Sequence, residues 1–419
     1  MTDVRLGVVG AGAIVQMAHL PAIAKTKGAR LVALCDNDRA KARALADRFE
    51  VPDVFTDIEE LLESDALDAV IVATPNHLHE PHVLAALAAK VHVLCERPLA
   101  VTARGVERIL AAAQRADRKV VVANNHRFRT DAQALDRFLR GGELGRLMAF
   151  RAGSYHLKRT PESWRTRRAE AGGGVFMEHG IPLLDLALWL ADYPEPTRLT
   201  AHMDRGRGAQ AVEDAMLVHI ECGPNLSISL DLNWSYVGED DRWWFETIST
   251  RGSTRLAPLR VVKELNGRPV DVSPTGAAAR ESAFVQSYRA ELAHFLAIVT
   301  GDAKYEAPTD QVVLLKLVEN VYKSADEGKE IRLWPRGASS RRRRSRFPPR
   351  PPGCSSSSRS HRCRRSSRRW CAWCPCRSRR AGWPTPGAGR VTECGSAGGS
   401  ASSATARRST GSRSRSRST

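Results

Sequence analysis

The chain contains no apolar run long enough to span a membrane, and no signal-peptide pattern precedes its first strand-like segment, which begins at residue 4. Cysteine is scarce in the first 335 of the 419 residues, where only Cys35, Cys95 and Cys222 occur. Such widely separated cysteines exclude a disulfide framework and are typical of a reducing compartment. We therefore expect a cytoplasmic protein with no membrane partner.

Leucine, isoleucine, methionine and lysine are all missing from residues 336–419, which are rich in arginine and serine. This segment holds 22 arginines and one acid, Glu393, and therefore carries a net charge of +21, whereas residues 1–335 carry −3. Because such a composition cannot bury enough apolar surface to offset its ordering entropy, we expect a disordered tail. A reading-frame shift in GC-rich DNA is the origin that we favour, and a tail that binds nucleic acid is the alternative.

A glycine-rich turn lies near the start of the chain. An apolar segment at 4–9 precedes it, and residues 16–24 continue with helical spacing. A strand that turns sharply into a helix directs free N–H groups and the positive end of the helix dipole at one point, which suits a pyrophosphate. Gly10 permits the tight turn, Gly12 lets phosphates approach the backbone, and Val15 replaces the third glycine of the usual pattern. The residues predicted to surround the phosphates are Gly10, Gly12, Ala13 and Ile14.

The second strand-like segment, at 30–35, ends in Asp36. An acidic side chain at this position can accept hydrogen bonds from both hydroxyls of the adenosine ribose, and it would repel a 2′-phosphate. Asp36 therefore predicts NAD as the cofactor, with NADP less favoured.

Strand-like and helical segments alternate over residues 1–125, which predicts a parallel sheet covered on both faces, the Rossmann type of α/β domain. Ligands bind beyond the carboxyl ends of the strands in such sheets, so the loops that carry Gly10, Asp36, Thr74 and Glu96 should converge. The expected strands after the second are 69–73, 91–95 and 120–123, and the expected helices are 79–89 and 102–116.

The pattern changes over residues 126–335, where longer alternating strands dominate. We expect a mainly antiparallel sheet with a few helices, a second domain of the α+β type. The expected strands are 147–154, 199–203, 215–222, 226–234 and 245–250, and the expected helices are 180–189 and 311–325. The aromatic runs 233–236 and 243–244 predict self-association, or else they line the substrate pocket.

Together these motifs resemble the glucose–fructose oxidoreductase, inositol dehydrogenase and rhizopine catabolism (Gfo/Idh/MocA) family from residue 5 to about residue 333. The motifs are Gly10-Ala11-Gly12, Thr74-Pro75-Asn76-His77-Leu78-His79, Glu96-Arg97-Pro98, Gly172-Gly173-Gly174 with Gly180 and Asp185, Glu213-Asp214, and Ser324 to Lys329. The resemblance implies an enzyme that oxidises or reduces a sugar, cyclitol or related polyol with a nicotinamide cofactor. It implies that the second sheet is open-faced and that residues 126–335 serve substrate binding and oligomerisation. It also implies that Thr74, Pro75, Asn76, His79, Glu96 and Arg97 contact that cofactor.

The proton-transfer residues depart from the family pattern. The family has a lysine in Glu-Lys-Pro and an Asp-x-x-x-His pair, and the matching positions here are Arg97, Glu178 and Pro182. Arg97 keeps the positive charge but cannot exchange a proton near neutral pH. Glu178 keeps a carboxylate on a longer side chain, whereas Pro182 has no proton chemistry. We take Arg97, Glu178 and His179 as the catalytic candidates, although His179 could equally pack beside Gly180.

Other candidate groups leave alternatives open. Tyr155, His156 and Lys158 are expected on a loop after the strand at 147–154, where they could replace the missing proton donors or simply face solvent. No metal site is predicted, because neither His77, His79 and His82 nor the cysteine run at 371–376 has a complete ligand set around it. A family member that binds the nucleotide but has little or no dehydrogenase activity remains the alternative function.

Overall fold

The computed structural model describes residues 3–64, 67–157, 163–205, 212–274 and 281–333. Lys158, the cysteine run at 371–376 and the whole segment 336–419 lie outside these residues, so the predictions made for them are not addressed by the structure. Within the described ranges, every helix is too short or too polar to cross a lipid bilayer.

In the described residues of the first half, six parallel strands form a sheet in the order β3-β2-β1-β4-β5-β6. This order is that of a Rossmann fold, with its reversal point between β1 and β4. The strands are β1 (Val4–Val9), β2 (Ala29–Cys35), β3 (Asp53–Phe55), β4 (Ala69–Val72), β5 (His92–Glu96) and β6 (Val120–Ala123). The predicted parallel sheet is confirmed, and its central strands are buried on both faces.

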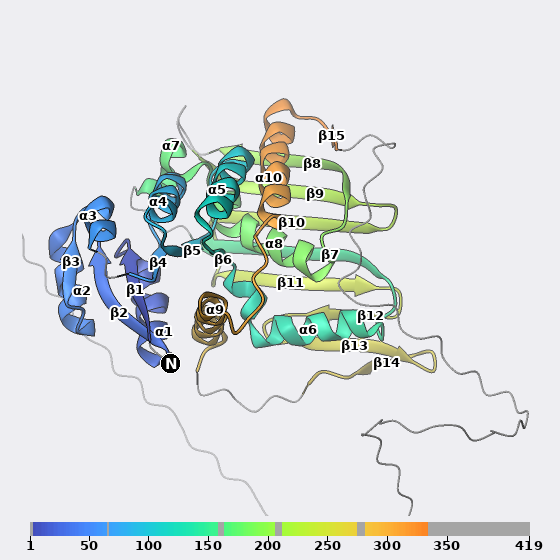
Figure 1. Ribbon diagram of the computed structural model, residues 1–419. Coiled ribbons are helices and arrows are strands. Elements are labelled where there is room, and N and C mark those ends of the chain that lie inside the picture. The colour runs from blue at the N-terminus through green and yellow to red at the C-terminus, as the bar shows by residue number, and fades with distance from the viewer. Residues whose placement is uncertain (1–2, 65–66, 158–162, 206–211, 275–280, 334–419) are drawn as a thin grey trace, which may run out of the picture. The chain divides into compact units, whose positions relative to one another are not determined.

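Helices cover this sheet on both sides (Figure 1). They are α1 (Leu20–Lys25), α2 (Arg39–Phe49), α3 (Ile58–Glu63), α4 (Asn76–Ala88) and α5 (Ala103–Ala116). A π-helical turn, η1 (Val15–His19), precedes α1 and begins at the residue that replaces the third glycine. The side chain of Val15 is fully buried there, so the wider turn coincides with the bulkier residue.

The second sheet contains nine strands in the part of the chain that the structure describes, ordered β14-β13-β12-β11-β7-β10-β9-β8-β15. Its neighbours are antiparallel except for β7 and β10. The predicted open-faced, mainly antiparallel sheet is therefore confirmed. The strands are β7 (Leu147–Leu157), β8 (Pro196–Arg205), β9 (Glu213–Cys222), β10 (Leu226–Tyr236), β11 (Arg242–Ser249), β12 (Gly252–Arg255), β13 (Arg260–Leu265), β14 (Arg268–Asp271) and β15 (Ile331–Arg332).

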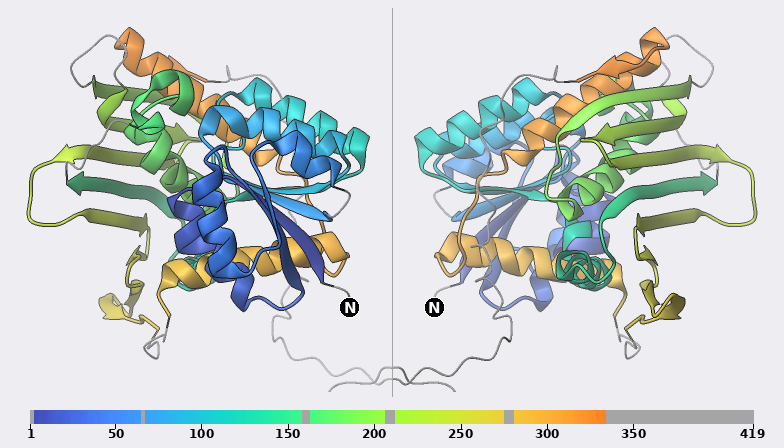
Figure 2. Two further views of the ribbon diagram at one scale, coloured as in Figure 1. Left: turned by 90° about the vertical axis from the view of Figure 1, so that its left-hand side faces the viewer. Right: turned by 90° about the vertical axis from the view of Figure 1, so that its right-hand side faces the viewer.

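Helices lie on one side of this sheet (Figure 2). They include α6 (Thr130–Gly141), α8 (Ile181–Leu190) and α10 (Asp310–Glu327). The short turn η2 (Asn125–Phe128) precedes α6, and η3 (Trp164–Thr166), α7 (Arg168–Ala171) and η4 (Phe176–Gly180) lead from β7 to α8. Phe150, Ile228 and Phe245 point from the strands into the core beneath these helices and are fully buried. The helix predicted at 311–325 ends where Gly328 adopts a left-handed conformation, with φ of 62°.

One long helix, α9 (Ala283–Thr300), was not predicted. Apolar residues lie on several of its sides, so its sequence does not show the single apolar stripe of a surface helix. Although it follows the second sheet in sequence, α9 packs on the first one. Leu292 and Phe295 are buried there in the same cluster as Leu6 and Leu20. A segment distant in the sequence thus adds a further covering helix to the first sheet.

Candidate functional site

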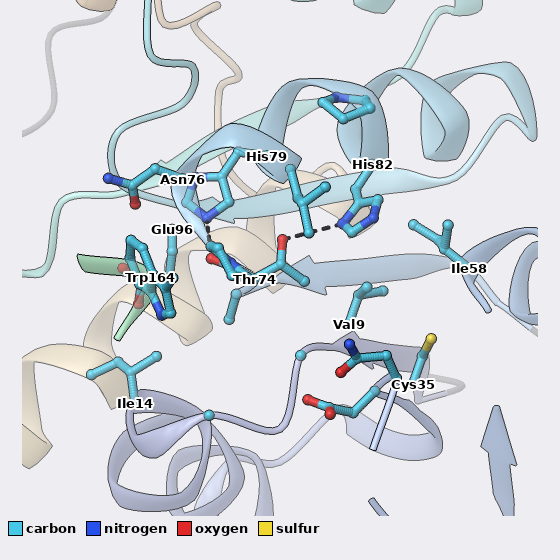
Figure 3. A pocket seen from close by; sticks show the side chains of 18 of the residues that line it. Val9, Ile14, Cys35, Ile58, Thr74, Asn76, His79, His82, Glu96 and Trp164 are labelled. Carbon is cyan, nitrogen blue, oxygen red and sulfur yellow. Dashed lines mark hydrogen bonds between the residues drawn. The ribbon is translucent and has the colours of Figure 1, made fainter. Parts of the chain in front are cut away.

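A pocket of about 630 Å³ lies at the carboxyl ends of β1, β2, β4 and β5, where the strand order reverses. Figure 3 shows Cys35 and Ile58 at one end of it and Trp164 near Glu96 at the other. Residues predicted from five separate segments of the chain thus come together around one space. Those that line it are Gly10, Gly12, Ala13, Ile14, Asp36, Thr74, Pro75, Asn76, His79, Glu96, Arg97 and Glu178.

The two glycines of the first turn differ in their surroundings. Gly10 has φ of +100°, and a Cβ atom there would lie 2.5 Å from the carbonyl oxygen of Ala73. Only glycine fits this turn. Gly12 has no atom within 4 Å of its Cβ position, although it lines the pocket. Its backbone therefore faces open space at a helix start, which fits the close approach of a pyrophosphate.

Asp36 is held in place by three donors. Its Oδ2 accepts from the backbone N–H of Ala11 at 2.7 Å, and its Oδ1 accepts from the N–H of Asp38 at 2.9 Å. Lys41 forms an ion pair with the same Oδ1 at 2.9 Å. A fixed carboxylate with lone pairs remaining can still accept ribose hydroxyls. Lys41 also lines the pocket and was not predicted, although it stands only five residues after Asp36 in the printed sequence.

The three histidines of α4 contact protein atoms. The ring of His79 is fully buried and contacts the carbonyl oxygens of Thr74 at 2.8 Å and Pro98 at 2.7 Å. Burial lowers its pKa, and the two carbonyl acceptors oppose that shift in part. His82 contacts the Thr74 hydroxyl at 3.1 Å, and His77 contacts the carbonyl oxygen of Glu170 at 3.2 Å. No metal-binding group of three side chains occurs among the described residues.

Glu96 lies at the end of β5 and pairs with His19 of η1, with 2.8 Å between Nε2 and Oε1. Burial alone would raise the pKa of Glu96, but the hydrogen bond and charge of His19, together with the charge of Arg97, outweigh it and lower the pKa. Tyr288 of α9 packs edge-on against His19, with 5.1 Å between ring centres, and also lines the pocket. The unpredicted helix thus supplies one wall of the site.

Arg97 follows Glu96 directly in the sequence. Its Nη1 donates to the carbonyl oxygen of Glu178 at 3.5 Å, which is at the limit of a hydrogen bond. Its Nε is buried and has no partner in the described part of the chain. The guanidinium therefore reaches the pocket with donors to spare.

Glu178 lies on the π-helical turn η4, which the triple glycine positions. A Cβ atom at Gly174 would lie 2.1 Å from the carbonyl oxygen of Glu213, so the chain can pass there only as glycine. The buried Glu213 carboxylate accepts from the N–H of Phe176 at 3.0 Å and from the Tyr322 hydroxyl at 2.8 Å. This arrangement holds the turn at the pocket edge and so sets the place of Glu178.

The carboxylate of Glu178 forms an ion pair with Arg165, with 3.0 Å between Nε and Oε2. Arg165 lies over the ring of Trp164 at 4.4 Å, and all three residues line the pocket. Pro182, one turn further on, is buried in α8. Glu178 is therefore the candidate carboxylate that lines the pocket, and Arg165 is its ion-pair partner.

His179 is not among the residues that line the pocket. Its ring stacks on His156 at 4.1 Å and faces Trp234 at 6.5 Å. Burial lowers the pKa of His179 to about 4, so the ring is neutral near pH 7. His156 contacts Ser154 at 2.8 Å and Asp241 at 3.3 Å. His179 is thus part of a second group of side chains, on the helix-covered side of the larger sheet.

Two expectations about the larger sheet need correction. Tyr155 and His156 lie on β7 and not on a loop, because the strand runs three residues beyond its predicted end. Alternation along β7 then separates them: His156 meets His179, whereas the Tyr155 hydroxyl donates to Asp231 at 2.6 Å. Tyr155 also packs against Trp244, on the face opposite to Phe245 and the core. A role for Tyr155 as a replacement proton donor is therefore wrong.

The two aromatic runs are split in the same way. Trp243 packs with Phe245 and with His126, whereas its neighbour Trp244 lies on the outer face. Trp234 meets His179 on the inner side and donates to Asp214 at 2.6 Å. The expected aromatic runs therefore do not form one surface, because their side chains lie on opposite faces of the sheet.

His126 was missed at the sequence level. It lies in η2, just past the carboxyl end of β6, and the rule that ligands bind at strand ends could have identified it. Burial and the charges of Arg97 and Arg129 lower its pKa to about 3. Its Nδ1 is buried and has no partner within the described ranges. His126 is therefore a neutral group beside Arg97 with a free acceptor or donor.

Comparisons with known proteins agree with this geometry. Residues 4–124 match the oxidoreductase family GFO_IDH_MocA, described as an NAD-binding Rossmann fold, and residues 132–255 match the GFO/IDH/MocA C-terminal domain. D-glucoside 3-dehydrogenase of Escherichia coli (strain K12) is 25% identical over 79% of this chain and 98% of its own length. Inositol 2-dehydrogenase of Acidothermus cellulolyticus is 31% identical over 70% of this chain and 84% of its own length.

Among solved structures, levoglucosan dehydrogenase in complex with NADH and L-sorbose superposes with a TM-score of 0.71. It covers 79% of this chain and 99% of its own, and at 22% identity the likeness concerns the fold. The resemblance predicted from the motifs is thus confirmed at the level of sequence families and of architecture. The chain belongs to the GFO/IDH/MocA oxidoreductase family and is an enzyme of that family with an NAD-binding Rossmann domain.

Proposed function

We propose that the protein is an NAD(P)-dependent oxidoreductase, with NAD preferred, that transfers hydride to or from a sugar, cyclitol or related polyol. One observation carries the proposal: a single pocket joins the glycine turn and Asp36 at one end to Arg97 and Glu178 at the other. Two relatives are named for action on a glucoside and on inositol, which supports the substrate class.

The cofactor end of the pocket fits a dinucleotide. Gly10, Gly12, Ala13 and Ile14 would hold the pyrophosphate, and Asp36 would accept the ribose hydroxyls. The remaining residues that we assign to the cofactor are Thr74, Pro75, Asn76, His79, Glu96 and Arg97. A bound nicotinamide would supply the hydride acceptor or donor. Asp36 favours NAD, and Lys41 beside it moderates the preference by offering a cation to a 2′-phosphate.

At the substrate end of the pocket, we assign the residues that transfer the proton of the reacting hydroxyl. We assign Glu178 as the acceptor of the hydroxyl proton, because its carboxylate lines the pocket. Arg97 keeps a permanent positive charge that stabilises a developing alkoxide, but it cannot itself exchange the proton. His179 is neutral near pH 7 and would assist from the neighbouring group of side chains.

The experiment has two steps. NADH fluorescence should shift on binding, and turnover should then appear with a panel of sugars and cyclitols in the presence of NAD. A blue shift without turnover on any substrate would contradict the dehydrogenase proposal.

A second candidate is a nucleotide-binding protein with little or no dehydrogenase activity. It is favoured by the ion pair that engages Glu178 with Arg165 and by the buried Pro182 in place of an imidazole. Both candidates predict cofactor binding, so turnover distinguishes them.

We also propose a cytoplasmic homo-oligomer with a Rossmann domain at 1–125, a substrate domain at 126–335 and a separate tail. The free, buried thiols of Cys35, Cys95 and Cys222 support a reducing compartment. A second copy would cover the outer face of the larger sheet, where Leu217 is 51% exposed. Light scattering that gives a monomeric mass at micromolar concentration would contradict the oligomer.

A further inference from the structure

Three permanent cations line the pocket, and they differ in their pairing. Lys41 pairs with Asp36 at 2.9 Å, and Arg165 pairs with Glu178 at 3.0 Å. Arg97 forms no ion pair with any described residue, and its Nε is buried without a hydrogen-bond partner. A buried guanidinium donor left without an acceptor is costly, so this position favours an acceptor from a ligand.

The carboxylates near Arg97 do not fill that role. Glu96 is ionised, but its Oε1 contacts His19 and its Oε2 accepts the backbone N–H of Arg97 at 3.3 Å. Glu178 turns its carboxylate to Arg165 and offers Arg97 only its carbonyl oxygen. Glu291 of α9 is fully buried, and neither of its oxygens has a partner among the described residues. Burial raises the pKa of Glu291, which favours its protonated form and weakens any charge that it could offer the guanidinium.

The two histidines near Arg97 are uncharged near pH 7. His126 and His179 both have lowered pKa values, of about 3 and about 4, and the charge of Arg97 contributes to each shift after burial. Trp243 and Trp234 present ring faces or edges to these two histidines. Arg97 therefore lies close to two neutral imidazoles, which do not balance its charge.

We propose that the substrate carries a carboxylate close to the hydroxyl that reacts, and that Arg97 binds this carboxylate. The proposal rests on the proposed function and deepens it, because it names the substrate class as sugar acids or carboxylated cyclitols. The planar guanidinium offers paired N–H donors that match the two oxygens of a carboxylate, which an ammonium group cannot do. The carboxylate takes no part in bond changes and serves to anchor and orient the substrate.

Acid and amide pairs of equal size test this directly. We would measure kcat/KM for D-gluconate against D-gluconamide and for D-glucuronate against D-glucuronamide, with NAD saturating. The wild type should prefer at least one acid over its amide by about tenfold or more, as expected for a charge-assisted pair. Arg97→Gln should remove the preference, and Arg97→Lys should keep part of it.

Arg165→Gln is the matched control, because Arg165 lines the same pocket but already has a carboxylate partner. It should leave the acid-to-amide ratio unchanged even if turnover falls. Melting temperature and NADH fluorescence report whether each variant is folded and binds cofactor. If Arg165→Gln removes the preference while Arg97→Gln keeps it, the assignment to Arg97 is overturned.

The remaining outcomes separate this inference from the proposed function. Turnover of amides and neutral sugars at least as fast as of acids would overturn the inference and leave the dehydrogenase proposal standing. If no compound is turned over, calorimetric binding of D-gluconate and D-glucuronate to the NADH-loaded protein decides. If the wild type binds either acid and Arg97→Gln does not, the inference is supported. If both proteins bind the acids equally, or if the wild type binds neither acid detectably, the inference is overturned.

Discussion

The two ends of the pocket are built differently. At the cofactor end, Asp36 and His79 have hydrogen-bond partners from the protein itself, and Glu96 between the ends pairs with His19. At the substrate end, Arg97 Nε is buried without a partner among the described residues, and so is Nδ1 of the neighbouring His126. The polar groups of the first end thus already have hydrogen-bond partners, whereas the second keeps buried polar atoms without them. We therefore expect substitutions at the two ends of the pocket to change different quantities, cofactor preference at the first end and turnover at the second.

The largest expected effect concerns the substrate end. Glu178→Gln should reduce turnover by on the order of a hundredfold or more, because it removes the proposed proton acceptor. NADH affinity should stay unchanged, since the side chain lies away from the glycine turn. Steady-state kinetics together with fluorescence titration would measure both quantities.

Restoring the family residues is the complementary change. Arg97→Lys should keep or raise turnover of neutral polyols, because lysine can exchange a proton. Pro182→His would add an imidazole one turn from Glu178. If Glu178→Gln is silent and neither restoration yields activity on any substrate, the nucleotide-binding candidate should replace the dehydrogenase.

The next largest effect is expected at the cofactor end. It should change the preference for NADH over NADPH and leave the turnover rate unaffected. Asp36→Ala should narrow the gap between NADH and NADPH affinity by about tenfold, because hydrogen bonds to the carboxylate are lost with the repulsion of a 2′-phosphate. Lys41→Ala is the opposing control and should widen the gap. Calorimetry that finds the wild type preferring NADPH would refute the assignment.

Mild acid should lower the stability of the folded protein through two buried histidines near Arg97. His126 and His179 have pKa values of about 3 and about 4 in the folded protein. In the unfolded chain they titrate near about 6.5, so between about pH 7 and about pH 5 only the unfolded state gains these protons. The melting temperature should therefore fall over this range. His126→Gln should weaken the fall, and an equally steep fall in that variant would argue against a buried, neutral His126.

The smallest effect is expected from the tail. Truncation after Trp334 should change the melting temperature by no more than about 2 °C, because residues 336–419 contain no leucine, isoleucine or methionine to add to a core. Solubility at low salt should improve as repulsive charge is removed. A large loss of melting temperature would show that the tail contributes to the fold of the enzyme.

Sequence alone determined the features that depend on short stretches of chain. The strands β1 and β6 have the predicted bounds, and the helices α5 and α10 lie within two residues of theirs. Gly10 and Asp36 could be placed because a parallel sheet brings strand ends to one edge. The family followed from motifs that are each local, and so did the substitutions at Arg97, Glu178 and Pro182.

Only the tertiary structure decided which distant side chains meet. The packing of α9 on the first sheet brings Tyr288 to the pocket and Glu291 near Arg97, and no local pattern reveals such a crossing. The pairing of Glu178 with Arg165 likewise depends on a turn that residues outside its own segment hold in place. Burial and pairing depend on all the neighbours of a group at once, and for that reason the free donor of Arg97 could be found only in the folded chain.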